Sequence, residues 1–408
     1  MIPFSANRAM DGKNYATPVL VLNCKLGALA IMRTLGVLGV PLYGIDEDHR
    51  SPGLLSRYCR ERFIRSYAEE KEEEYLEYVL QVGKKTGKGT ILIPTSDDLS
   101  VFVAKYADPL SGYFMFPKND PFLFRNLISK EGMYRLAREH SVPTPHTIFP
   151  KKPDDVLEWS GDCQFPVMLK GIHGNRLQKK TGKKMVIINS REDLIANYRE
   201  LEDPERPNLM IQEYIPGDDD QIYIFNGYFD DRSECLAAFT GHKIRQFPVH
   251  VGCASLGVCT WNPKVAELTT GFMKRIGYRG ILDIGYRWDS RDGLYKVLDI
   301  NPRVGQAFRL FVSEEGMDVV RNLYLDLTGQ ISVMPSVPRE GRRWVIEDMD
   351  IISSYHYYRE GTLRFGDWVR SFRNLEEGAW FSVKDPVPFF HMVGKLTGKA
   401  ARFVAKRA

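Results

Sequence analysis

The chain has 408 residues, a length typical of two or three domains. Hydrophobic residues make up 43% and charged residues 26%, which is ordinary for a globular protein and excludes a disordered or fibrous chain. The formal charge of +4 is too small to indicate nucleic-acid binding, so we expect no nucleic-acid partner. Six scattered cysteines without a CxxC pair predict reduced thiols and a cytoplasmic location.

Strands alternate with helices in the first part of the chain. Short apolar runs at residues 19–22, 41–46 and 90–94 predict buried parallel strands, and residues 28–38 have the apolar spacing of a helix. This alternation is typical of an α/β layer with a mostly parallel sheet. We therefore predict a first domain of this type at residues 15–117.

After residue 118 the pattern changes from mixed to antiparallel. The expected helices lie at residues 126–140, 191–201 and 317–329, and the expected strands at 167–170, 209–214, 222–225 and 235–240. A further hairpin is expected at residues 281–303. We predict three more units: a linker helix with a small lobe at 118–215, a large lobe with an antiparallel sheet at 216–334, and a separate C-terminal extension at 335–408.

The hairpin at residues 281–303 carries an acidic pattern. Its turn centres on Arg291, and Asp283 and Asp299 each lie eight residues from that centre, so they are predicted to face one another. Side chains alternate along a strand, so the residues expected to share a face are Tyr295, Val297, Asp299 and Asn301. Facing like charges are destabilising, and a divalent cation would remove that penalty. Two carboxylates and an amide oxygen suit Mg²⁺, whereas the alternative is that both aspartates are solvated on an open sheet face.

Four cationic residues form a second pattern. Lys170 ends an apolar strand, and Arg303 follows the acidic hairpin. Lys243 and Arg245 are two apart, so in an extended segment both are expected to point to one face. Such cations can hold phosphate or carboxylate groups, although each one alone could be a solvated surface charge.

A strand at residues 209–211 runs into a Pro216-Gly217 break and then three consecutive acids at 218–220. The backbone freed at such a break can hydrogen-bond the edge of a planar base, and an acid beyond it can accept hydrogen bonds from ribose hydroxyls. The alternative is a plain connection between two strands.

The order of these motifs resembles the ATP-grasp superfamily, carboxylate–amine ligase type, over residues 15–330. The matching segments are Ser129-Lys130, residues 142–145, 165–170 and 212–217, Asp283, and residues 298–303. Residues 94–97 and 243–248 are most similar to the branch related to carbamoyl-phosphate-synthase domains and D-aspartate ligases.

The resemblance implies an N-terminal parallel α/β pre-ATP-grasp domain, a two-lobed ATP-grasp fold and a C-terminal extension. The implied activity is an ATP-dependent ligation of a small-molecule carboxylate to an amine through an acylphosphate, with release of ADP and phosphate. The implied cofactors are ATP and Mg²⁺, with Mn²⁺ as an alternative metal. Two other functions stay open: another ATP-grasp phosphotransfer or carboxylation, and a non-catalytic nucleotide-binding regulator.

The resemblance also assigns roles to particular residues. The residues implied to contact ATP are Lys130, Lys170, Gln212, Glu213 at the adenine amino group, Tyr214 and Ile215 at the hinge, and Asp219 or Asp220 at the ribose. The implied metal ligands are Asp283, Asp299 and Asn301. The implied catalytic residues near the γ-phosphate and the acylphosphate are Lys243, Arg245 and Arg303. Substrate specificity is expected from residues 23–27 and 95–98 and from the segment after Arg303.

The chain departs from the family pattern at two points. The acid before the Asn-Pro-Arg tripeptide is usually Glu but is here Asp299, one methylene shorter. The flap after Lys170 is usually rich in glycine but is here basic, at residues 171–184. Lys184 is the predicted phosphate contact in this flap, and Lys183 is an alternative.

The last twenty residues, 389–408, predict a basic amphipathic helix. The expected apolar stripe consists of Phe389, Val393, Leu396, Ala400, Phe403 and Val404, and the basic residues are Lys395, Lys399, Arg402, Lys406 and Arg407. Such a helix could contact the inner face of the cytoplasmic membrane as a peripheral anchor. Alternatively, it could pack on the domain or on a second subunit, which would make the protein a homodimer.

Overall fold

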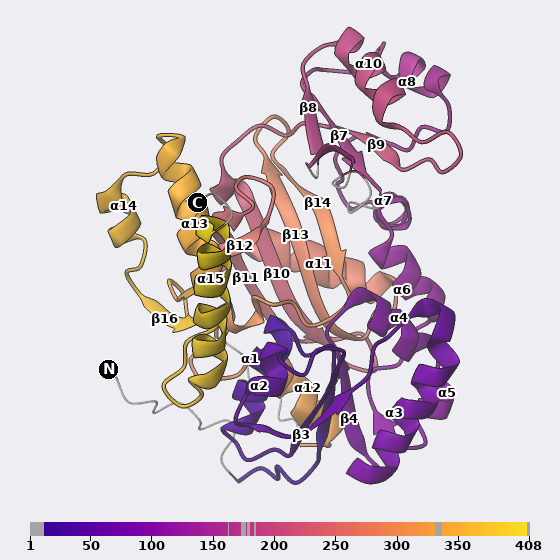
Figure 1. Ribbon diagram of the computed structural model, residues 1–408. Helices are drawn as coiled ribbons and strands as arrows, with labels where there is room; N and C mark the ends of the chain where they lie inside the picture. The colour runs from indigo at the N-terminus through magenta and orange to yellow at the C-terminus, as the bar shows by residue number, and fades with distance from the viewer. Residues whose placement is uncertain are drawn as a thin grey trace.

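The computed structural model describes residues 12–161, 163–172, 177, 180–182, 185–330 and 337–405, without the side chains of 399–405. These residues form three sheets that are connected by helices (Figure 1). The arrangement confirms the expected class, a parallel α/β layer followed by a two-lobed α+β unit. In the described part of the chain no helix is long and apolar enough to cross a membrane.

The N-terminal layer is a parallel sheet with the strand order β3-β2-β1-β4-β5. Its strands are β1 Val19–Leu22, β2 Leu42–Asp46, β3 Cys59–Ile64, β4 Thr90–Pro94 and β5 Phe114–Met115. Its helices are α1 Leu26–Gly36, α2 Pro52–Leu55, α3 Glu72–Thr86, α4 Asp97–Lys105 and α5 Ala107–Leu110, with a 3₁₀ turn at Glu69–Lys71. The strand order changes direction between β1 and β4, and ligands of open α/β sheets bind at such a point.

Two linker helices, α6 Pro121–Ile128 and α7 Lys130–Glu139, replace the single helix predicted at 126–140. The break lies at Ser129, whose backbone is extended (φ −72°, ψ 128°) and whose side chain accepts a hydrogen bond from Gly132 N. Ser129 therefore caps a new helix, and Lys130 becomes its first residue.

The small lobe is an antiparallel sheet with the order β6-β9-β7-β8. Its strands are β6 Thr147–Ile148, β7 Val167–Gly171, β8 Met185–Ile188 and β9 Leu209–Glu213, and its helices are α8 Pro153–Trp159 and α10 Arg191–Leu201. Helices α8 and α10 cover one face of this sheet at the top of Figure 1 and pack on it through a cluster that includes Leu169 and Leu194. The opposite face is left for the cavity described below.

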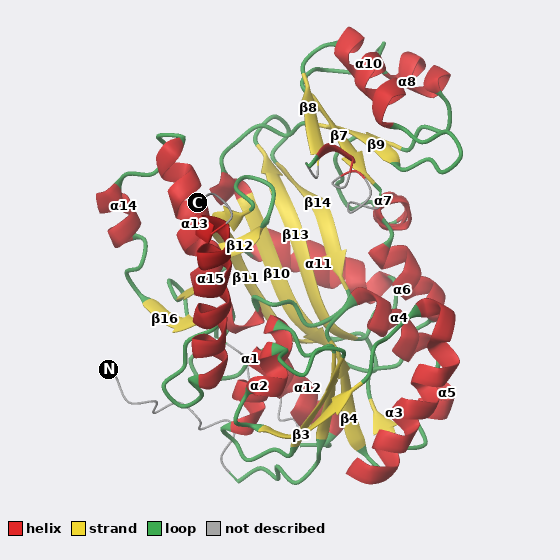
Figure 2. Cartoon of the chain, in the orientation of Figure 1, coloured by secondary structure: helices red, strands yellow, loops and turns green. Residues whose placement is uncertain are grey.

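The large lobe is a sheet with the order β14-β13-β10-β11-β12-β15-β16 (Figure 2). Its main strands are β10 Ile222–Phe229, β11 Cys235–Phe247, β12 Cys253–Cys259, β13 Gly280–Asp289 and β14 Leu294–Asn301, and 3₁₀ turns lie at Asp219–Gln221 and Phe308–Leu310. Alternation along β10 separates two cores. Phe225 and Phe229 pack with helix α11 (Pro263–Arg275), whereas Ile224 and Tyr228 pack with helix α12 (Val319–Leu327).

The C-terminal segment does not form a separate unit, contrary to the prediction. Its strand β15 (Arg343–Val345) pairs antiparallel with β12, and β16 (Leu375–Gly378) pairs parallel with β15. The segment therefore extends the large sheet, and its helix α13 (Glu347–Arg359) packs against β11 and β12. Helix α14 (Phe365–Arg370) lies at the outer edge of the molecule in Figure 1, and the last helix is α15 (Val387–Ala405).

Helix α15 packs against α2, and of the predicted apolar stripe Phe389 is half-buried against the ring of Phe381. Met392 is buried, whereas Val393 and Leu396 are 36% and 38% exposed and Phe390 is 66% exposed. The helix is therefore rotated so that a face next to the predicted stripe contacts the protein. The stripe residues 400, 403 and 404 lie outside the described side chains.

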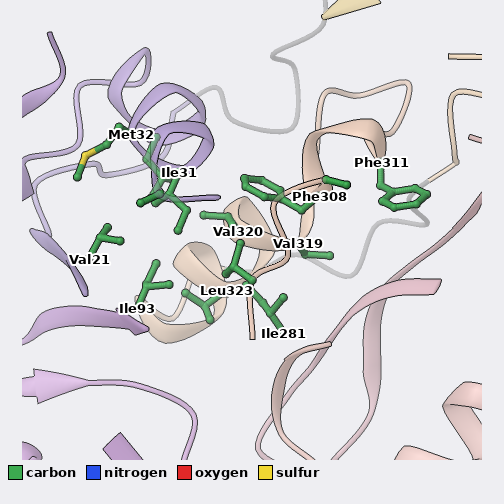
Figure 3. Close-up of a cluster of buried hydrophobic side chains, with 14 of the residues drawn as sticks. Val21, Ile31, Met32, Ile93, Ile281, Phe308, Phe311, Val319, Val320 and Leu323 are labelled. Atoms are coloured by element: carbon green, nitrogen blue, oxygen red, sulfur yellow. The ribbon is translucent and has the colours of Figure 1, made fainter. Parts of the chain in front are cut away.

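A buried cluster joins the N-terminal layer to the large lobe (Figure 3). Val21 and Ile93 from the parallel sheet and Ile31 from α1 lie close to Val320 and Leu323 of α12. These side chains are all at most 4% exposed. The contact holds the loops after β1 and β4 in a fixed position next to the large sheet, because close-packed interiors resist displacement.

Candidate functional site

A cavity of about 1730 Å³ lies between the three sheets, and nearly every predicted site residue lines it. Of the predicted residues, Glu213 is not part of the lining, and Lys184 lies outside the described residues. The segments expected to determine specificity, at 23–27, 95–98 and 304–307, reach the cavity from the N-terminal layer and from the loop after β14.

The acidic hairpin has a different register from the predicted one. Asp283 lies opposite Asn301, and Asp299 lies opposite a glycine. The reason is a bulge at Leu298, which has no partner on β13. The bulge also breaks the alternation, because Val297 is fully buried in the core while Asp299 lines the cavity. The predictions that the two aspartates face each other and that Val297 shares their side are wrong, although all three polar residues still line the cavity.

Positive charges surround Asp299. Lys130 Nζ lies 2.5 Å from Asp299 Oδ1, and Asn301 Nδ2 donates to Oδ2 at 3.0 Å. Burial raises the pKa of Asp299, but Lys130, Asn301 and Arg303 together lower it by more, so the net pKa is below the usual range. Arg303 donates to Asn301 Oδ1 at 3.1 Å and to Asp97 Oδ1 at 2.5 Å. The end of β14 is therefore a connected network of charges at the wall of the cavity.

Asp283 lies in a tighter environment. Burial raises the pKa of Asp283 to about 6, although Arg303 opposes the shift. A Cβ atom at Gly305 would lie 2.0 Å from Asp283 Oδ2, so only glycine leaves room for this carboxylate. A buried carboxylate with a raised pKa gains most from an additional positive charge.

The donor set of the hairpin fits a divalent cation that binds together with phosphate. Among the described residues no three His, Cys, Asp or Glu side chains are grouped for a metal. Mg²⁺ uses one or two carboxylates together with phosphate and water oxygens, so Asp283, Asp299 and Asn301 suffice. The Asn301 amide presents its nitrogen to Asp299, so it must turn over before its oxygen can bind a cation next to that carboxylate.

Lys170 and Gln212 form the wall on the side of the small lobe. Lys170 Nζ donates to Gln212 Oε1 at 2.6 Å, and Gln212 Nε2 donates to Tyr134 Oη and Thr147 Oγ1 at 2.8 and 2.9 Å. Burial, followed by the nearby Lys130, lowers the pKa of Lys170 to about 7. Lys170 lacks a carboxylate partner in these contacts, which leaves its charge for an anion in the cavity.

Glu213 points away from the cavity. Its carboxylate accepts hydrogen bonds from Lys296 Nζ at 2.9 Å, Arg291 Nη2 at 2.8 Å and His146 N at 2.9 Å. Since neighbours in a strand alternate, Gln212 occupies the cavity side and Glu213 the other. Only the main chain of Glu213 is therefore available to contact an adenine amino group, and the adenine-binding role of Glu213 stays a prediction.

Tyr214 and Ile215 continue from β9 and line the cavity, as the hinge prediction requires. Arg287, which the sequence did not single out, fixes this hinge. Its Nε donates to Ile215 O at 2.9 Å, and its Nη2 donates to Gly217 O at 2.5 Å. The Pro-Gly break is thus held from β13, at the expected place for a base edge.

The structure distinguishes Asp219 from Asp220. The Asp219 carboxylate accepts a hydrogen bond from the Tyr357 hydroxyl and lies 3.2 Å from His250 Nδ1. Asp220 is exposed and accepts only from the neighbouring Gln221 at 3.0 Å among the contacts of the described residues. Asp220 is therefore the better candidate for the ribose hydroxyls.

Lys243 and Arg245 do not form the expected pair of free charges. Lys243 Nζ donates to Gly252 O at 2.7 Å and Gln246 Oε1 at 3.2 Å and lines the cavity. Arg245 is 3% exposed, and its Nε and Nη2 bind both carboxylate oxygens of Asp350 at 2.9 and 2.7 Å. A register shift lies between the two residues, and although both line the cavity, the Arg245 guanidinium is bound to Asp350.

Sequence reasoning missed the wall of the cavity that comes from the C-terminal segment. The lining residues from this segment are Tyr357, Thr362, Leu363, Asp367 and Ser371. No charge pattern or spacing marks these residues, because their position depends on β15 joining β12. The aromatic run at residues 355–358 was the available signal, and it does not distinguish an exposed tyrosine from a buried one.

Comparison with known proteins finds a curated relative over part of the chain. No family model matches the chain. The chain is similar to a D-aspartate ligase of Enterococcus faecium (strain Aus0004), with 29% identity over 288 residues, which is 67% of this chain and 68% of the relative.

Several solved structures share the arrangement of sheets. N5-carboxyaminoimidazole synthetase of Staphylococcus aureus in complex with ADP has a TM-score of 0.63 at 12% identity and covers 86% of this chain and 87% of its own. The chain has the ATP-grasp fold.

Two further ATP-grasp structures extend the comparison. The biotin carboxylase domain dimer of a Hydrogenobacter thermophilus 2-oxoglutarate carboxylase, with MgADP, ADP and bicarbonate, has a TM-score of 0.61 at 16% identity and covers 81% of this chain and 74% of its own. An L-amino acid ligase of Bacillus licheniformis has a TM-score of 0.57 at 13% identity and covers 79% of this chain and 78% of its own. The ATP-grasp motifs identified in the sequence are thus accompanied by the matching fold.

Proposed function

We propose that this protein is an ATP-dependent ligase that joins a carboxylate to an amine through an acylphosphate. The observation that carries the proposal is the convergence in one cavity of Asp283, Asp299 and Asn301 with the cations Lys130, Lys170, Lys243 and Arg303. The similarity to a D-aspartate ligase supports an amino acid as one substrate.

The residues of the chain suit the two bond changes of this reaction. In the first, a carboxylate oxygen attacks the γ-phosphorus of ATP, the bond to the bridging oxygen breaks, and ADP leaves. In the second, an amine nitrogen attacks the acyl carbon, phosphate leaves, and the nitrogen loses a proton. Lys130, Lys170 and Lys243 bind and orient the phosphates, and Arg303 holds the carboxylate, so catalysis is mainly positioning and electrostatic stabilisation.

The expected cofactors are ATP and Mg²⁺, with Mn²⁺ as an alternative. Asp283, Asp299 and Asn301 would hold the metal, which neutralises phosphate charge when it is bound. Tyr214 and Ile215 would contact the base, and Asp220 would contact the ribose. A lysine of the flap at residues 171–184, for which we choose Lys184, would contact the phosphates. The segments at 23–27 and 95–98 would contact the two small-molecule substrates.

The experiment that tests the function is an assay of ADP release with ATP, Mg²⁺ and a panel of acceptors. The panel contains D-aspartate, other amino acids, simple amines and bicarbonate, each alone and in pairs, and mass spectrometry identifies the product. ADP release that needs an amino acid and an amine supports the ligase. Release that needs bicarbonate would instead favour carboxylation, and nucleotide binding without release under any condition would favour a regulatory binder.

We also propose a cytoplasmic protein whose residues 389–408 contact the inner face of the membrane. The supporting observation is that Phe390, Val393 and Leu396 remain exposed on α15 next to Lys395. A homodimer that covers these side chains is the alternative.

A further inference from the structure

Helix α13 of the C-terminal segment lies against β11 and β12 and reaches the cavity at its last turn. Asp350, in the first part of the helix, holds Arg245 with both carboxylate oxygens and also accepts from Ser255 Oγ at 3.0 Å. Asp350 and Arg245 are 2% and 3% exposed. The helix is therefore anchored to the sheet by a buried ion pair, and its position relative to the cavity is well defined.

Two turns later, the Tyr357 hydroxyl connects three segments of the cavity wall. It donates to the Asp219 carboxylate, and it lies 3.3 Å from both Gln246 N and His250 N, from which it accepts. Tyr357 is 7% exposed. One hydroxyl thus joins the end of β11, the loop between β11 and β12, and the connection before β10.

The segment that Tyr357 holds is the one that fixes Lys243. Lys243 Nζ donates to Gly252 O and to Gln246 Oε1, which lie near the two ends of this segment. Two of the three ammonium protons are thus used, and the third is left for an anion in the cavity. Gln246 is 1% exposed, and its Nε2 has no hydrogen-bond partner among the described residues, so the contact of its amide with Lys243 is made through Oε1.

We propose that Tyr357 is a positioning residue that acts through Lys243. By holding residues 246–252, it keeps the Lys243 ammonium directed at the phosphate that is transferred, so the C-terminal segment is part of the active site. This inference rests on the proposed function, because it assumes that the cavity binds the triphosphate of ATP.

The test compares Tyr357→Phe with Tyr358→Phe, a matched control whose side chain is 62% exposed. For each protein, the affinity for ADP and for a non-hydrolysable ATP analogue is measured with Mg²⁺ by calorimetry. We expect Tyr357→Phe to lower the affinity for the analogue about five- to tenfold and to keep the affinity for ADP within about twofold of the wild type. The same substitution should lower kcat by at least about tenfold. The control should match the wild type.

The ratio of the two affinities does not depend on the fraction of folded protein, because unfolded chains reduce the binding of both ligands equally. A second arm repeats Tyr357→Phe in a Lys243→Ala background. If Tyr357 acts through Lys243, the ratio should not change further in this background, because the effects of coupled residues are not additive. A Tyr357→Phe effect of equal size in both backgrounds would overturn the inference.

The outcomes separate this inference from the proposed function. If the wild type binds both nucleotides and Tyr357→Phe leaves their ratio unchanged, Tyr357 has only a structural role and the function stands. If the wild type prefers the analogue, loses that preference in Tyr357→Phe and yet turns over no substrate pair, the positioning role stands and the ligase activity fails. If the wild type binds neither nucleotide, both are overturned.

Discussion

Lys130 and Asp299 form an ion pair at the wall of the cavity, with Nζ 2.5 Å from Oδ1. The two residues come from different units, the start of α7 and the end of β14. A cation that binds Asp299 must share the carboxylate with Lys130 or displace it. The displaced ammonium would then be directed at the phosphates that arrive with the cation.

Replacing Asp299 with Asn should abolish turnover and leave the fold intact. The loss of one carboxylate removes charge that stabilises a bound cation, which costs several kcal/mol of transition-state stabilisation, or on the order of 10³-fold in rate. The measurement is ADP release over a range of Mg²⁺ concentrations. Asp231→Asn, in the exposed turn between β10 and β11, is the matched control and should keep the wild-type rate. Normal turnover of Asp299→Asn at saturating Mg²⁺ would exclude the metal role.

ATP affinity should fall as the pH rises above neutral, because of Lys170. Burial lowers the pKa of Lys170 to about 7, so the amine of the unliganded protein is charged below this pH and neutral above it. Binding of phosphate favours the charged form, so the protein must take up a proton at higher pH, and the affinity falls by up to about tenfold per pH unit.

Calorimetry at about pH 8.5 in two buffers that differ in protonation enthalpy should detect this proton uptake. Lys170→Arg should make the ATP affinity less dependent on pH, since a guanidinium stays charged. Lys170→Ala should lower the ATP affinity at every pH and also lower kcat. An ATP affinity that does not depend on pH and is unchanged in Lys170→Ala would show that Lys170 is only a residue at the end of a strand.

Glu213→Gln should destabilise the protein without changing nucleotide affinity. Its carboxylate is bound to Lys296, Arg291 and His146 N, outside the cavity. Removing the charge should cost about 1–3 kcal/mol in the free energy of unfolding and leave the Kd for ADP within about twofold. Denaturant titration and calorimetry measure the two quantities. A large loss of affinity with unchanged stability would instead assign the side chain to adenine.

Asp350→Asn should be strongly destabilising, because it leaves the Arg245 guanidinium buried with an incomplete partner. Breaking one side of a buried ion pair costs about 3–5 kcal/mol, which urea unfolding can measure directly. The control is Glu74→Gln, which removes the exposed pair with Arg65 and should cost no more than about 1 kcal/mol. Equal effects of the two substitutions would argue that the Arg245–Asp350 contact is not formed in solution.

Removing α15 should remove membrane binding. The full chain is expected to sediment with anionic vesicles at low salt, and a chain that ends at Pro388 is not, because each basic residue near anionic lipid contributes about 1 kcal/mol. Neutral vesicles control for non-specific adsorption, and Phe390→Ser tests the exposed apolar side chain. If neither chain sediments, the helix serves only for packing, and analytical ultracentrifugation would then test the homodimer.

The sequence predicted the parts of the site that depend on local chemistry. The strand before Lys170, the Pro-Gly break and the acidic hairpin are all local patterns, and their residues meet in one cavity between the sheets. The predictions failed where a single residue changes the direction of a strand. The bulge at Leu298 shifts Asp299 away from Asp283, and the shift after Lys243 turns Arg245 toward Asp350.

Neither bulge has a signal in the sequence, because both strands keep ordinary strand composition across it. The role of Tyr357 was equally inaccessible, since it depends on a pairing between β12 and β15 that are far apart in the chain. The helix break at Ser129 did carry a signal, because serine is a preferred N-cap residue and the family resemblance has Ser129-Lys130 opening a helix, although the apolar spacing alone predicted one helix across it.

The pairing of β15 with β12 also sets the order in which a newly made chain becomes competent. The ribosome releases the strands that carry Lys170, Lys243, Asp283 and Asp299 well before Asp350 and Tyr357. Domains fold as units during synthesis, so these strands can assemble while the last part of their cavity is still missing. A chain that stops before residue 343 would hold Lys170 and Lys243 without helix α13, whose Tyr357 hydroxyl accepts hydrogen bonds from Gln246 N and His250 N.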